Sequence, residues 1–573
     1  MSDPGAPPAS SDPEPALAGG EIASAPTPAP LSIRRRLRGG LPSAAAGLAA
    51  VILGLGVSEL IAAIVAPAAS PVLVVGSLMI DAAPGWAKET AIALFGTGDK
   101  AALLTGLGIV LAIVAGAAGV LERWKSPLGR VVIGAAGVFG VGAAITRNGS
   151  APFDIIPAAA ATVVALITLG VLLRAMDEPI RPRPLNPAAV RAGMGGRQPN
   201  ALELARAAEA QRREAARLTR RKFLGLTSGA VTLGAVTALG GYALQAGARA
   251  TTAACNALKL PAPAVKAAAV PAGAELGIGG VPALVVSNTD FYRIDTALQI
   301  PQIDPTQWKL SISGMVANPI SVTFAELLRL PLEESYTTLM CVSNAVGGNL
   351  IGNAKWLGYP IRHLLERAQP QSGADMVFSR SDDGFTASTP LSVLQEVDRN
   401  AILAVGMNGE PLPPEHGYPV RMVVPGLYGY VSATKWVVEL QVTTFSAHSA
   451  YWTQRGWSAR GPVKVESEIN VPQQGTSVKA GTVTVAGIAW HQHTGIQKVE
   501  VQVDNQAWAE AELAPAISTD TWVQWKYAWS ARSGQHTLRV RATSADGEVQ
   551  TSAIADTVPD GATGYHEVQV QVA

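Results

Sequence analysis

The sequence of 573 residues is poor in the residues that build several common functional sites. Its two cysteines, Cys255 and Cys341, are too few for a disulfide scaffold, a four-cysteine iron–sulfur cluster or a cysteine-rich zinc module. No histidine precedes His363 and no CxxCH motif occurs, so we expect no haem. Charged residues make up only 15%, with 44 Lys and Arg against 43 Asp and Glu, and this balance gives no indication of nucleic-acid binding.

Apolar residues are abundant instead, at 48% of the chain, and the mean hydropathy is +0.24. A helix of about 20 apolar residues crosses a bilayer. Five runs reach or approach that length: 41–66, 101–121, 131–147, 155–174 and 223–247. A sixth stretch, 72–96, contains Asp81, Lys88 and Glu89, which favour an interfacial or re-entrant helix. The sequence therefore predicts an all-α transmembrane bundle in contact with membrane lipid.

The distribution of arginine predicts how this bundle is oriented. Arginines cluster before the first span and again in 176–219, and the positive-inside rule places both regions in the cytoplasm. With five spans, everything after residue 248 then lies outside the cell membrane; with six, the final domain could face the cytoplasm. The TRRKFLG string at 219–225 resembles a twin-arginine export signal, although an ordinary positive flank explains it equally well.

Changes of composition divide the chain into seven regions. From about 285 aromatic residues and strand-like alternation indicate a globular domain, and beyond 460 short alternating runs indicate an antiparallel sandwich of immunoglobulin type. We expect a disordered cytoplasmic tail (1–40), a helical bundle (41–175), a cytoplasmic Arg-rich linker (176–219), a final transmembrane helix (220–247), an extracytoplasmic tether (248–284), a globular domain (285–460) and the sandwich (461–573).

Cys341 is the main candidate for chemistry. A lone cysteine is usually a small buried apolar residue. This one, in LMCVSNAVGG, is followed by Asn344 and by glycines that let backbone approach a ligand closely. A thiolate can bind a soft or high-valent metal, and since the globular domain has no second cysteine, such a metal would take its remaining sulfur from a cofactor.

Three segments of the globular domain resemble the molybdopterin domain of the sulfite oxidase family. They are LMCVSN with AKWLGYPI around Cys341, NGEPLPPEHGYPVRMVVPGLYGYVSATKW at 408–436, and DFYRID at 290–295. The sandwich resembles the dimerisation domain of that family, which implies a possible homodimer. The expected fold class is thus multi-domain: a transmembrane bundle, an α+β molybdopterin domain and an all-β immunoglobulin-like sandwich.

The resemblance implies a molybdenum–molybdopterin cofactor with a single pyranopterin, whose metal is bound by Cys341. It implies further cofactor contacts at Tyr292, Arg293, Asn344, His416, Arg421, Lys435 and either Thr434 or Ser432. Guanidinium and ammonium groups suit the pterin phosphate. Arg293 also matches a substrate position, Trp457 replaces a pocket tyrosine with Arg455 nearby, and His491 and His493 stand where the family has an arginine.

The reaction implied is oxygen-atom transfer on a small oxyanion or sulfoxide. Sulfite oxidation is the first choice and reduction of a sulfoxide or other oxo substrate is the second; a cofactor-free binding module and a transporter with an accessory domain are the alternatives. Electrons would leave to a separate cytochrome, copper protein or quinone-linked subunit. Roles stay open for Glu59 inside the first span, for the spare thiol of Cys255, and for Asp382 and Asp383.

Overall fold

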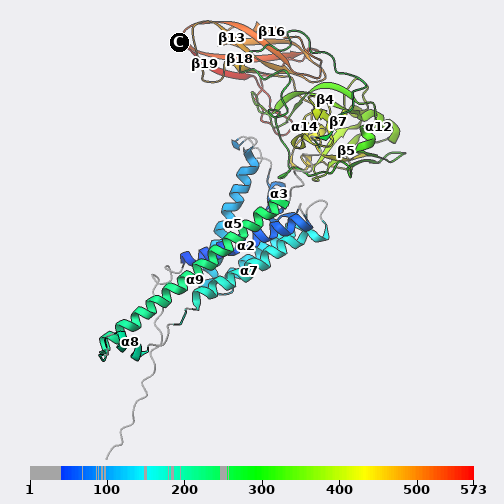
Figure 1. Ribbon diagram of the computed structural model, residues 1–573. Helices are drawn as coiled ribbons and strands as arrows, with labels where there is room; N and C mark the ends of the chain where they lie inside the picture. Colours follow the sequence, from blue (N-terminus) through cyan, green and yellow to red (C-terminus); the bar gives the residue numbers. More distant parts are fainter. Residues whose placement is uncertain are drawn as a thin grey trace, which may run out of the picture.

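The computed structural model describes residues 40–573 apart from 67–68, 85–86, 88–89, 92–93, 96–97, 147–150, 179, 182–185, 194, 196, 245–254 and 256. The expected disordered tail lies almost entirely outside the described residues. A helical bundle leads to a soluble part of two domains, with the C-terminus in the domain farther from the bundle (Figure 1).

The bundle is built from helices that the apolar runs predict. Its described elements are α2 (Gly40–Val65), α3 (Pro71–Ala82), α5 (Asp99–Trp124), α6 (Leu128–Ile145), the 3-10 turn η3 (Pro152–Asp154), α7 (Ile155–Asp177), α8 (Pro187–Gly193) and α9 (Ala201–Leu244). Among the described residues, five helices are long and apolar enough to cross a membrane. Of the charged stretch 72–96, residues 72–82 belong to α3, which at about 18 Å is too short to cross, and Lys88 and Glu89 lie outside the described residues. Ser70 Oγ donates to Glu59 Oε1 at 2.5 Å, so Glu59 has a hydrogen-bond partner between α2 and α3.

Glycines bring the helices of the bundle into close contact. A Cβ atom placed on Gly47 of α2 would lie 2.0 Å from the carbonyl oxygen of Ala115 in α5. One placed on Gly56 of α2 would lie 2.0 Å from the carbonyl oxygen of Gly234 in α9. Small residues at such contacts allow the backbones to approach, as in membrane helix pairs.

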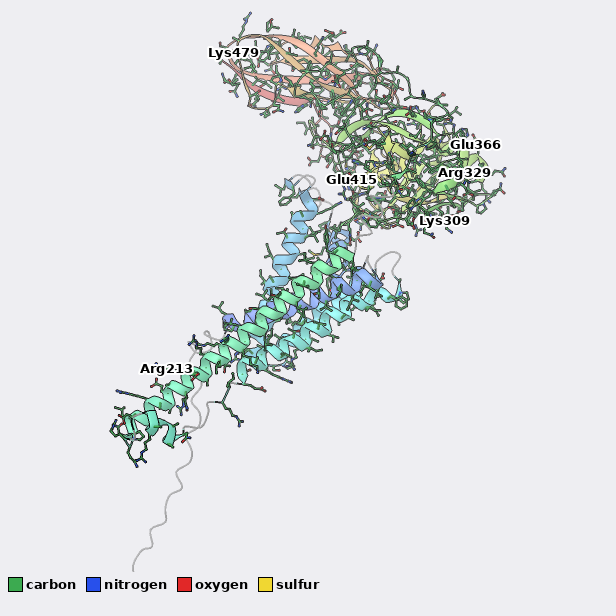
Figure 2. The ribbon with its side chains drawn as sticks, in the orientation of Figure 1. Arg213, Lys309, Arg329, Glu366, Glu415 and Lys479 are labelled. Atoms are coloured by element: carbon green, nitrogen blue, oxygen red, sulfur yellow. The ribbon has the colours of Figure 1, made fainter. Side chains whose placement is uncertain are left out.

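Helix α9 is longer than the sequence suggests. Its 44 residues extend over about 66 Å. It includes 201–219 of the expected linker together with the final span, because 201–222 is rich in Ala, Leu, Glu and Arg, which favour helix. Arg213 lies in the half of α9 that is remote from the soluble domains (Figure 2).

The first soluble domain is α+β and contains two sheets. Its mixed sheet has the order β2-β1-β10-β5-β6, from strands Ile320–Thr323, Lys309–Gly314, Val437–Thr443, Met376–Ser381 and Thr386–Pro390. Its second sheet has the order β3-β4-β7-β8, from Glu333–Met340, Ile351–Pro360, Ile402–Met407 and Glu410–Pro411, with β9 (Arg421–Val423) paired to β7. Short helices cover the sheets: α11 (Phe324–Leu327), α12 (Ile361–Ala368), α13 (Leu391–Gln395), α14 (Gly429–Ser432) and the 3-10 turns η4 (Pro414–His416) and η5 (Thr453–Arg455).

The second soluble domain is a β-sandwich. One sheet has the order β11-β13-β17-β16, from Glu466–Val471, Gly481–Trp490, Val523–Ala531 and Glu512–Leu513. The other has the order β12-β19-β18-β14-β15, from Ser477–Val478, His566–Val572, Gly534–Ser544, Ile496–Val503 and Ala509–Glu510. Alternating side chains of both sheets form its core, as the short alternating runs predict. The expected multi-domain fold class is confirmed.

Residues 258–284, within the region expected to be a tether, pack against both soluble domains. The indole nitrogen of Trp522 in the sandwich donates to the carbonyl oxygen of Leu284 at 3.0 Å. The backbone nitrogen of Ala264 donates to the carbonyl oxygen of Leu332 in the α+β domain at 2.7 Å. This segment is therefore fixed by backbone and side-chain hydrogen bonds despite its many Ala, Pro and Gly residues.

Candidate active site

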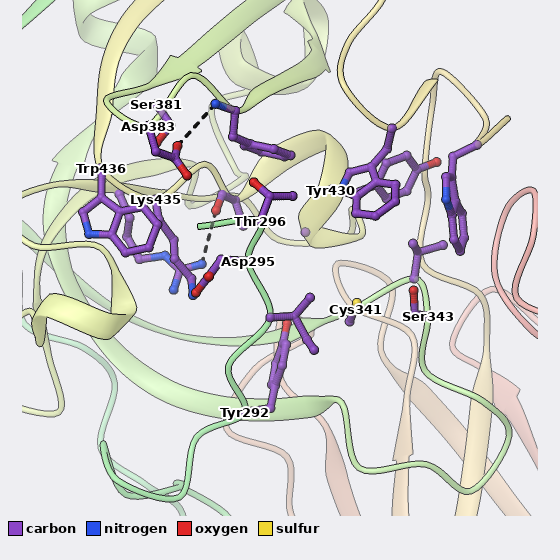
Figure 3. A pocket seen from close by; sticks show the side chains of 18 of the residues that line it. Tyr292, Asp295, Thr296, Cys341, Ser343, Ser381, Asp383, Tyr430, Lys435 and Trp436 are labelled. Carbon is purple, nitrogen blue, oxygen red and sulfur yellow. Dashed lines mark hydrogen bonds and ion pairs between the residues drawn. The ribbon is translucent and has the colours of Figure 1, made fainter. Parts of the chain in front are cut away.

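A cavity of about 860 Å³, counting its open mouth, lies in the α+β domain. Its wall combines charged, polar and aromatic side chains from the segments 291–296, 341–343, 381–385, 429–436 and 452–457 (Figure 3). Three segments of the sequence that carry candidate residues thus meet around one space.

Cys341 lines the cavity immediately after β3 ends. Its backbone nitrogen donates to the carbonyl oxygen of Leu350 at 2.9 Å, and the side-chain oxygen of Asn344 accepts from the backbone nitrogen of Leu350 at 2.7 Å. Asn344 therefore stabilises the 341–350 loop through its side chain. Burial raises the pKa of the Cys341 thiol, whereas hydrogen bonds from Ser343 and the charge of Lys435 act in the opposite direction.

Arg421, the first residue of β9, brings a buried positive charge to the cavity. Its guanidinium donates to three carbonyl oxygens, those of Met422, His416 and Ala433, at 3.2–3.4 Å. Among the described residues it has no carboxylate partner. Burial lowers the pKa of Arg421 to about 10. A buried cation held only by neutral groups is costly unless an anion joins it.

Lys435 supplies a second buried cation. Its Nζ atom lies 3.0 Å from both Asp295 Oδ2 and the carbonyl oxygen of Glu415. Burial lowers the pKa of Lys435 to about 8, and the attraction of Asp295 limits that decrease. Burial alone would raise the pKa of Asp295, but the charges of Lys435, Lys100 and Arg293 hold it well below its usual value.

Gly417 lets the two cationic residues lie side by side. Its φ of +115° is in the region that favours glycine. A Cβ atom there would lie 3.0 Å from the Cβ of Arg421 and 3.1 Å from the Cβ of Lys435. The neighbouring His416 donates through Nε2 to the carbonyl oxygen of Asn288 at 2.8 Å, and its buried Nδ1 has no partner among the residues that the structure describes. Burial lowers the pKa of His416 to about 4, so it is neutral at pH 7.

An aromatic wall, formed by Tyr430, Trp452 and Trp457, lines part of the cavity. The ring centroid of Trp457 lies 5.8 Å from that of Tyr430 and 6.2 Å from that of Trp452. The Tyr430 hydroxyl donates to the carbonyl oxygen of Ser458 at 2.8 Å, so the phenol is held in place. Burial raises the pKa of the Tyr292 hydroxyl, also in the lining, and keeps it neutral.

The structure brings only some of the candidate residues to the cavity surface. Those in the lining are Tyr292, Cys341, Asp383, Arg421, Lys435 and Trp457. Arg293 instead turns to Asp295, with Nε 2.9 Å from Oδ2. Thr434 is fully buried and its hydroxyl pairs with that of Ser379 at 2.7 Å, and Ser432 donates to Tyr428 O at 2.9 Å.

The other expected candidates also lie behind or beside the cavity. Arg455 stacks on Tyr451, with its guanidinium carbon 3.6 Å from the ring centroid. His493 joins the two soluble domains, since Nδ1 lies 2.9 Å from Asp520 Oδ1 and Nε2 lies 3.4 Å from Glu396 Oε1. Neither His491 nor His493 belongs to the cavity lining as described. The Cys255 thiol is buried and lies 3.4 Å from the carbonyl oxygen of Leu412.

Sequence reasoning missed several lining residues. Asp295 is the last residue of the DFYRID motif, and a carboxylate beside the expected cations was the signal that could have found it. The aromatic side chains of Phe385, Tyr430 and Trp452 gave no signal because aromatic residues are usually core residues. Their place in the site depends on tertiary contacts.

The donor set fits an anionic, sulfur-bearing cofactor. Arg421 and Lys435 offer buried positive charge for a phosphate, and Cys341 offers one sulfur ligand. Outside the lining, Nδ1 of His416 and Nδ2 of Asn344 are buried and have no hydrogen-bond partner among the described residues. Among the described residues, no group of three His, Cys, Asp or Glu side chains could hold a metal alone. A metal here would need further ligands from a cofactor.

Comparison with known proteins agrees with this chemistry. Residues 297–452 match the family model of the oxidoreductase molybdopterin binding domain, and 466–540 match a bacterial Ig domain. Mouse mitochondrial sulfite oxidase is 28% identical over 331 residues, which are 48% of this chain and 59% of that protein. The uncharacterized oxidoreductase YuiH of Bacillus subtilis is 34% identical over 158 residues, covering 28% of this chain and 76% of that protein.

Among solved structures, the sulfane dehydrogenase SoxCD from Paracoccus pantotrophus aligns with 48% of this chain and 76% of its own, at 21% identity and a TM-score of 0.43. The chain spans about half the length of the curated mammalian sulfite oxidases that it matches. The α+β domain and its cavity thus define a molybdopterin-binding oxidoreductase with an appended immunoglobulin-like domain. The chain belongs to the sulfite oxidase family.

Proposed function

We propose that this enzyme is a membrane-anchored oxidoreductase that oxidises sulfite to sulfate at a molybdenum cofactor with one pyranopterin. The observation that carries the proposal is the joint placement of the Cys341 thiol and the buried cations Arg421 and Lys435 around one cavity. When bound, the cofactor would supply two-electron oxygen-atom transfer, in which sulfite and water give sulfate, two protons and two electrons. The electrons would leave to a separate carrier such as a cytochrome, a copper protein or a quinone-linked subunit.

Each residue around the cavity has a definite task in this proposal. Cys341 would bind the metal, while Arg421 and Lys435 would hold the phosphate by charge-assisted hydrogen bonds. Neutral His416 donates through Nε2 to the carbonyl oxygen of Asn288, so its Nδ1 would accept a hydrogen bond from an N–H group of the pterin. Asn344 would act through the 341–350 loop, whose closure fixes the direction of the thiol.

Binding of an anionic substrate is supported by the charges near the cavity. Lys100, Arg293, Arg421 and Lys435 outnumber the two carboxylates Asp295 and Asp383. Burial raises the pKa of Asp383, and hydrogen bonds from Ser381 and Phe385 oppose that shift. The region around the cavity is therefore positively charged before the cofactor binds, which favours the approach of an anion.

A second candidate function is reduction of a neutral sulfoxide. It is favoured by the aromatic wall, which offers an apolar surface to the organic groups of such a substrate. Arg293 and Arg455, both expected near the substrate, are instead engaged with Asp295 and with Asp81 and Tyr451. Because these two arginines already have partners, they are less available to bind the sulfite anion.

The five long apolar helices support a multi-pass anchor in the cell membrane. The arginine-rich segment of α9 supports a cytoplasmic position for 201–222 and an extracytoplasmic position for the catalytic domain. The paired arginines Arg220 and Arg221 before the last apolar run would then serve twin-arginine export. The immunoglobulin-like domain would join two copies of the chain.

The decisive experiment compares the two cysteines in the purified full-length protein. Molybdenum and pterin contents are measured for wild type, Cys341→Ser and Cys255→Ser, followed by activity with sulfite plus an artificial electron acceptor and with sulfoxides plus a reduced dye. We expect Cys341→Ser to lose molybdenum and all activity, and Cys255→Ser to keep both, because Cys255 is buried away from the cavity. A wild-type protein that holds no molybdenum, or a Cys341→Ser variant that stays fully active, would refute the assignment.

A further inference from the structure

The helical bundle contacts one of the charged residues that line the cavity. Lys100, the second residue of α5, forms an ion pair with Oδ1 of Asp295, a cavity-lining residue of the soluble domain. The two partners are largely withdrawn from water, with side-chain exposures of 19% for Lys100 and 6% for Asp295. An ion pair at this depth is far less screened than one at the surface.

Asp295 connects Lys100 to the proposed phosphate site. The other oxygen of the same carboxylate, Oδ2, lies 3.0 Å from Lys435 Nζ and 2.9 Å from Arg293 Nε. Three cations thus share one carboxylate, which leaves an excess of about two positive charges in this cluster. A phosphate carries about two negative charges near neutral pH, so the cluster as a whole matches it.

The short helix α3 docks on the same side of the soluble domain (Figure 1). The Tyr451 hydroxyl donates to Asp81 Oδ1 at 2.9 Å, and the guanidinium of Arg455 donates to the carbonyl oxygen of Asp81 at 3.0 Å. A Cβ atom on Gly76 would lie 2.7 Å from Leu298 Cδ1, so Leu298 packs directly on α3. Tyr451 and Arg455 flank Trp452, a member of the aromatic wall.

From these contacts we propose that the membrane bundle completes the cofactor site: Lys100 acts as a positioning residue that stabilises the Asp295–Lys435–Arg293 cluster and so retains the cofactor. The inference rests on the proposed function only in taking this cavity as the cofactor site. The bundle is then more than an anchor, because a soluble domain separated from it would lack one of the three cations around Asp295.

The charge of Lys100 acts through Asp295. Without it, Asp295 would rely on Lys435 and Arg293 alone and would compete more strongly with the phosphate for Lys435. The contact at Asp81 contributes less, since that side chain is 53% exposed. Substitution of Lys100 should therefore reduce cofactor retention more than substitution of Asp81 does.

The test uses the full chain and measures pterin and molybdenum per protein, and the rate of pterin release on dilution, all without substrate. Lys100→Met is compared with Lys125→Met, which removes an exposed lysine just after the other end of α5. We expect Lys100→Met to lose most of its pterin and molybdenum and to release the remainder several-fold faster, while Lys125→Met matches wild type. Lys100→Arg, which keeps the charge, should restore retention.

Two outcomes would overturn the proposal. One is wild-type pterin content and release rate in Lys100→Met. The other is equal loss in Lys100→Met and Lys100→Arg, which would assign the effect to shape or folding rather than to charge. A wild-type protein that binds the cofactor but does not oxidise sulfite would refute the substrate proposed above and leave the role of Lys100 intact.

Discussion

The guanidinium carbon of Arg421 lies 5.1 Å from the centre of the Trp356 indole ring, and both side chains are buried. The π face of the ring and three carbonyl oxygens are what offset the buried charge of Arg421 in the protein without cofactor. This arrangement keeps a cation available for an anionic ligand at a cost in stability.

The first prediction concerns that cost. Arg421→Met should stabilise the cofactor-free protein by about 1–3 kcal/mol, because it removes a buried charge that has no carboxylate partner. The same change should abolish pterin retention. Chemical denaturation of the cofactor-free proteins measures the first effect and released pterin the second. A destabilised Arg421→Met protein would show that the guanidinium is held more favourably than we infer.

The pH dependence of cofactor retention should report Lys435. Burial lowers the pKa of Lys435 to about 8 in the cofactor-free protein, and the charged form is the one that binds phosphate. Affinity for the cofactor should therefore be highest below pH 8 and fall as the pH rises through that value. Pterin release rates from pH 6 to 9.5 test this, and Lys435→Arg, which stays charged, should flatten the profile.

Glu468 in β11 should destabilise the sandwich at neutral and higher pH. Burial raises the pKa of Glu468 to about 7 and that of the neighbouring Glu466 to about 8. Within the described part of the chain, Glu468 Oε2 has no hydrogen-bond partner. The unfolded state ionises near pH 4.5, so stability should fall as the pH rises from 4.5 through the folded-state values. Glu468→Gln should therefore add about 1–3 kcal/mol at pH 8 and much less at pH 4.5.

Thermal or denaturant unfolding at the two pH values measures this difference. Glu510→Gln, at an exposed position of β15, is the matched control and should have little effect at either pH. Equal stabilisation by Glu468→Gln at both pH values would rule out titration of this carboxyl group as the cause.

The close helix contacts of the bundle predict a sharp difference between two glycines of α9. A Cβ atom on Gly234 would lie 2.7 Å from the carbonyl oxygen of Ile52, whereas one on Gly229 would meet nothing within 4 Å. Gly234→Val should force α2 and α9 apart and lower the thermal stability of the purified protein, and Gly229→Val should be tolerated. Equal behaviour of the two variants would contradict the α2–α9 packing.

Much of the fold follows from local patterns in the sequence. The apolar runs predict the five long helices, and the alternating runs after residue 460 predict the sandwich, because burial of one face imposes a period on each element. The junction of the Arg-rich linker with the last span was not predictable in this way, since 201–222 is rich in Arg and Glu and continues α9 through helix propensity.

The candidate site was partly predictable for a different reason. Cys341, Arg421 and Lys435 stand in motifs whose residue types suit a metal and a phosphate, and these three meet at the cavity. Asp295 and Lys100 are separated by 195 positions and form their pair only through tertiary structure, which no local pattern encodes.

The packing of 258–284 decides where a water-soluble fragment of this enzyme has to begin. A fragment that starts at residue 285 would deprive the Trp522 indole of the Leu284 carbonyl and the Gln524 amide of the Pro282 carbonyl, two hydrogen bonds of 3.0 and 2.8 Å. Both side chains are buried, so each would keep a polar group that has lost its hydrogen bond, and the packing of the two domains would be less stable. The practical N-terminal limit for expression therefore lies at residue 258, well before the catalytic fold itself starts.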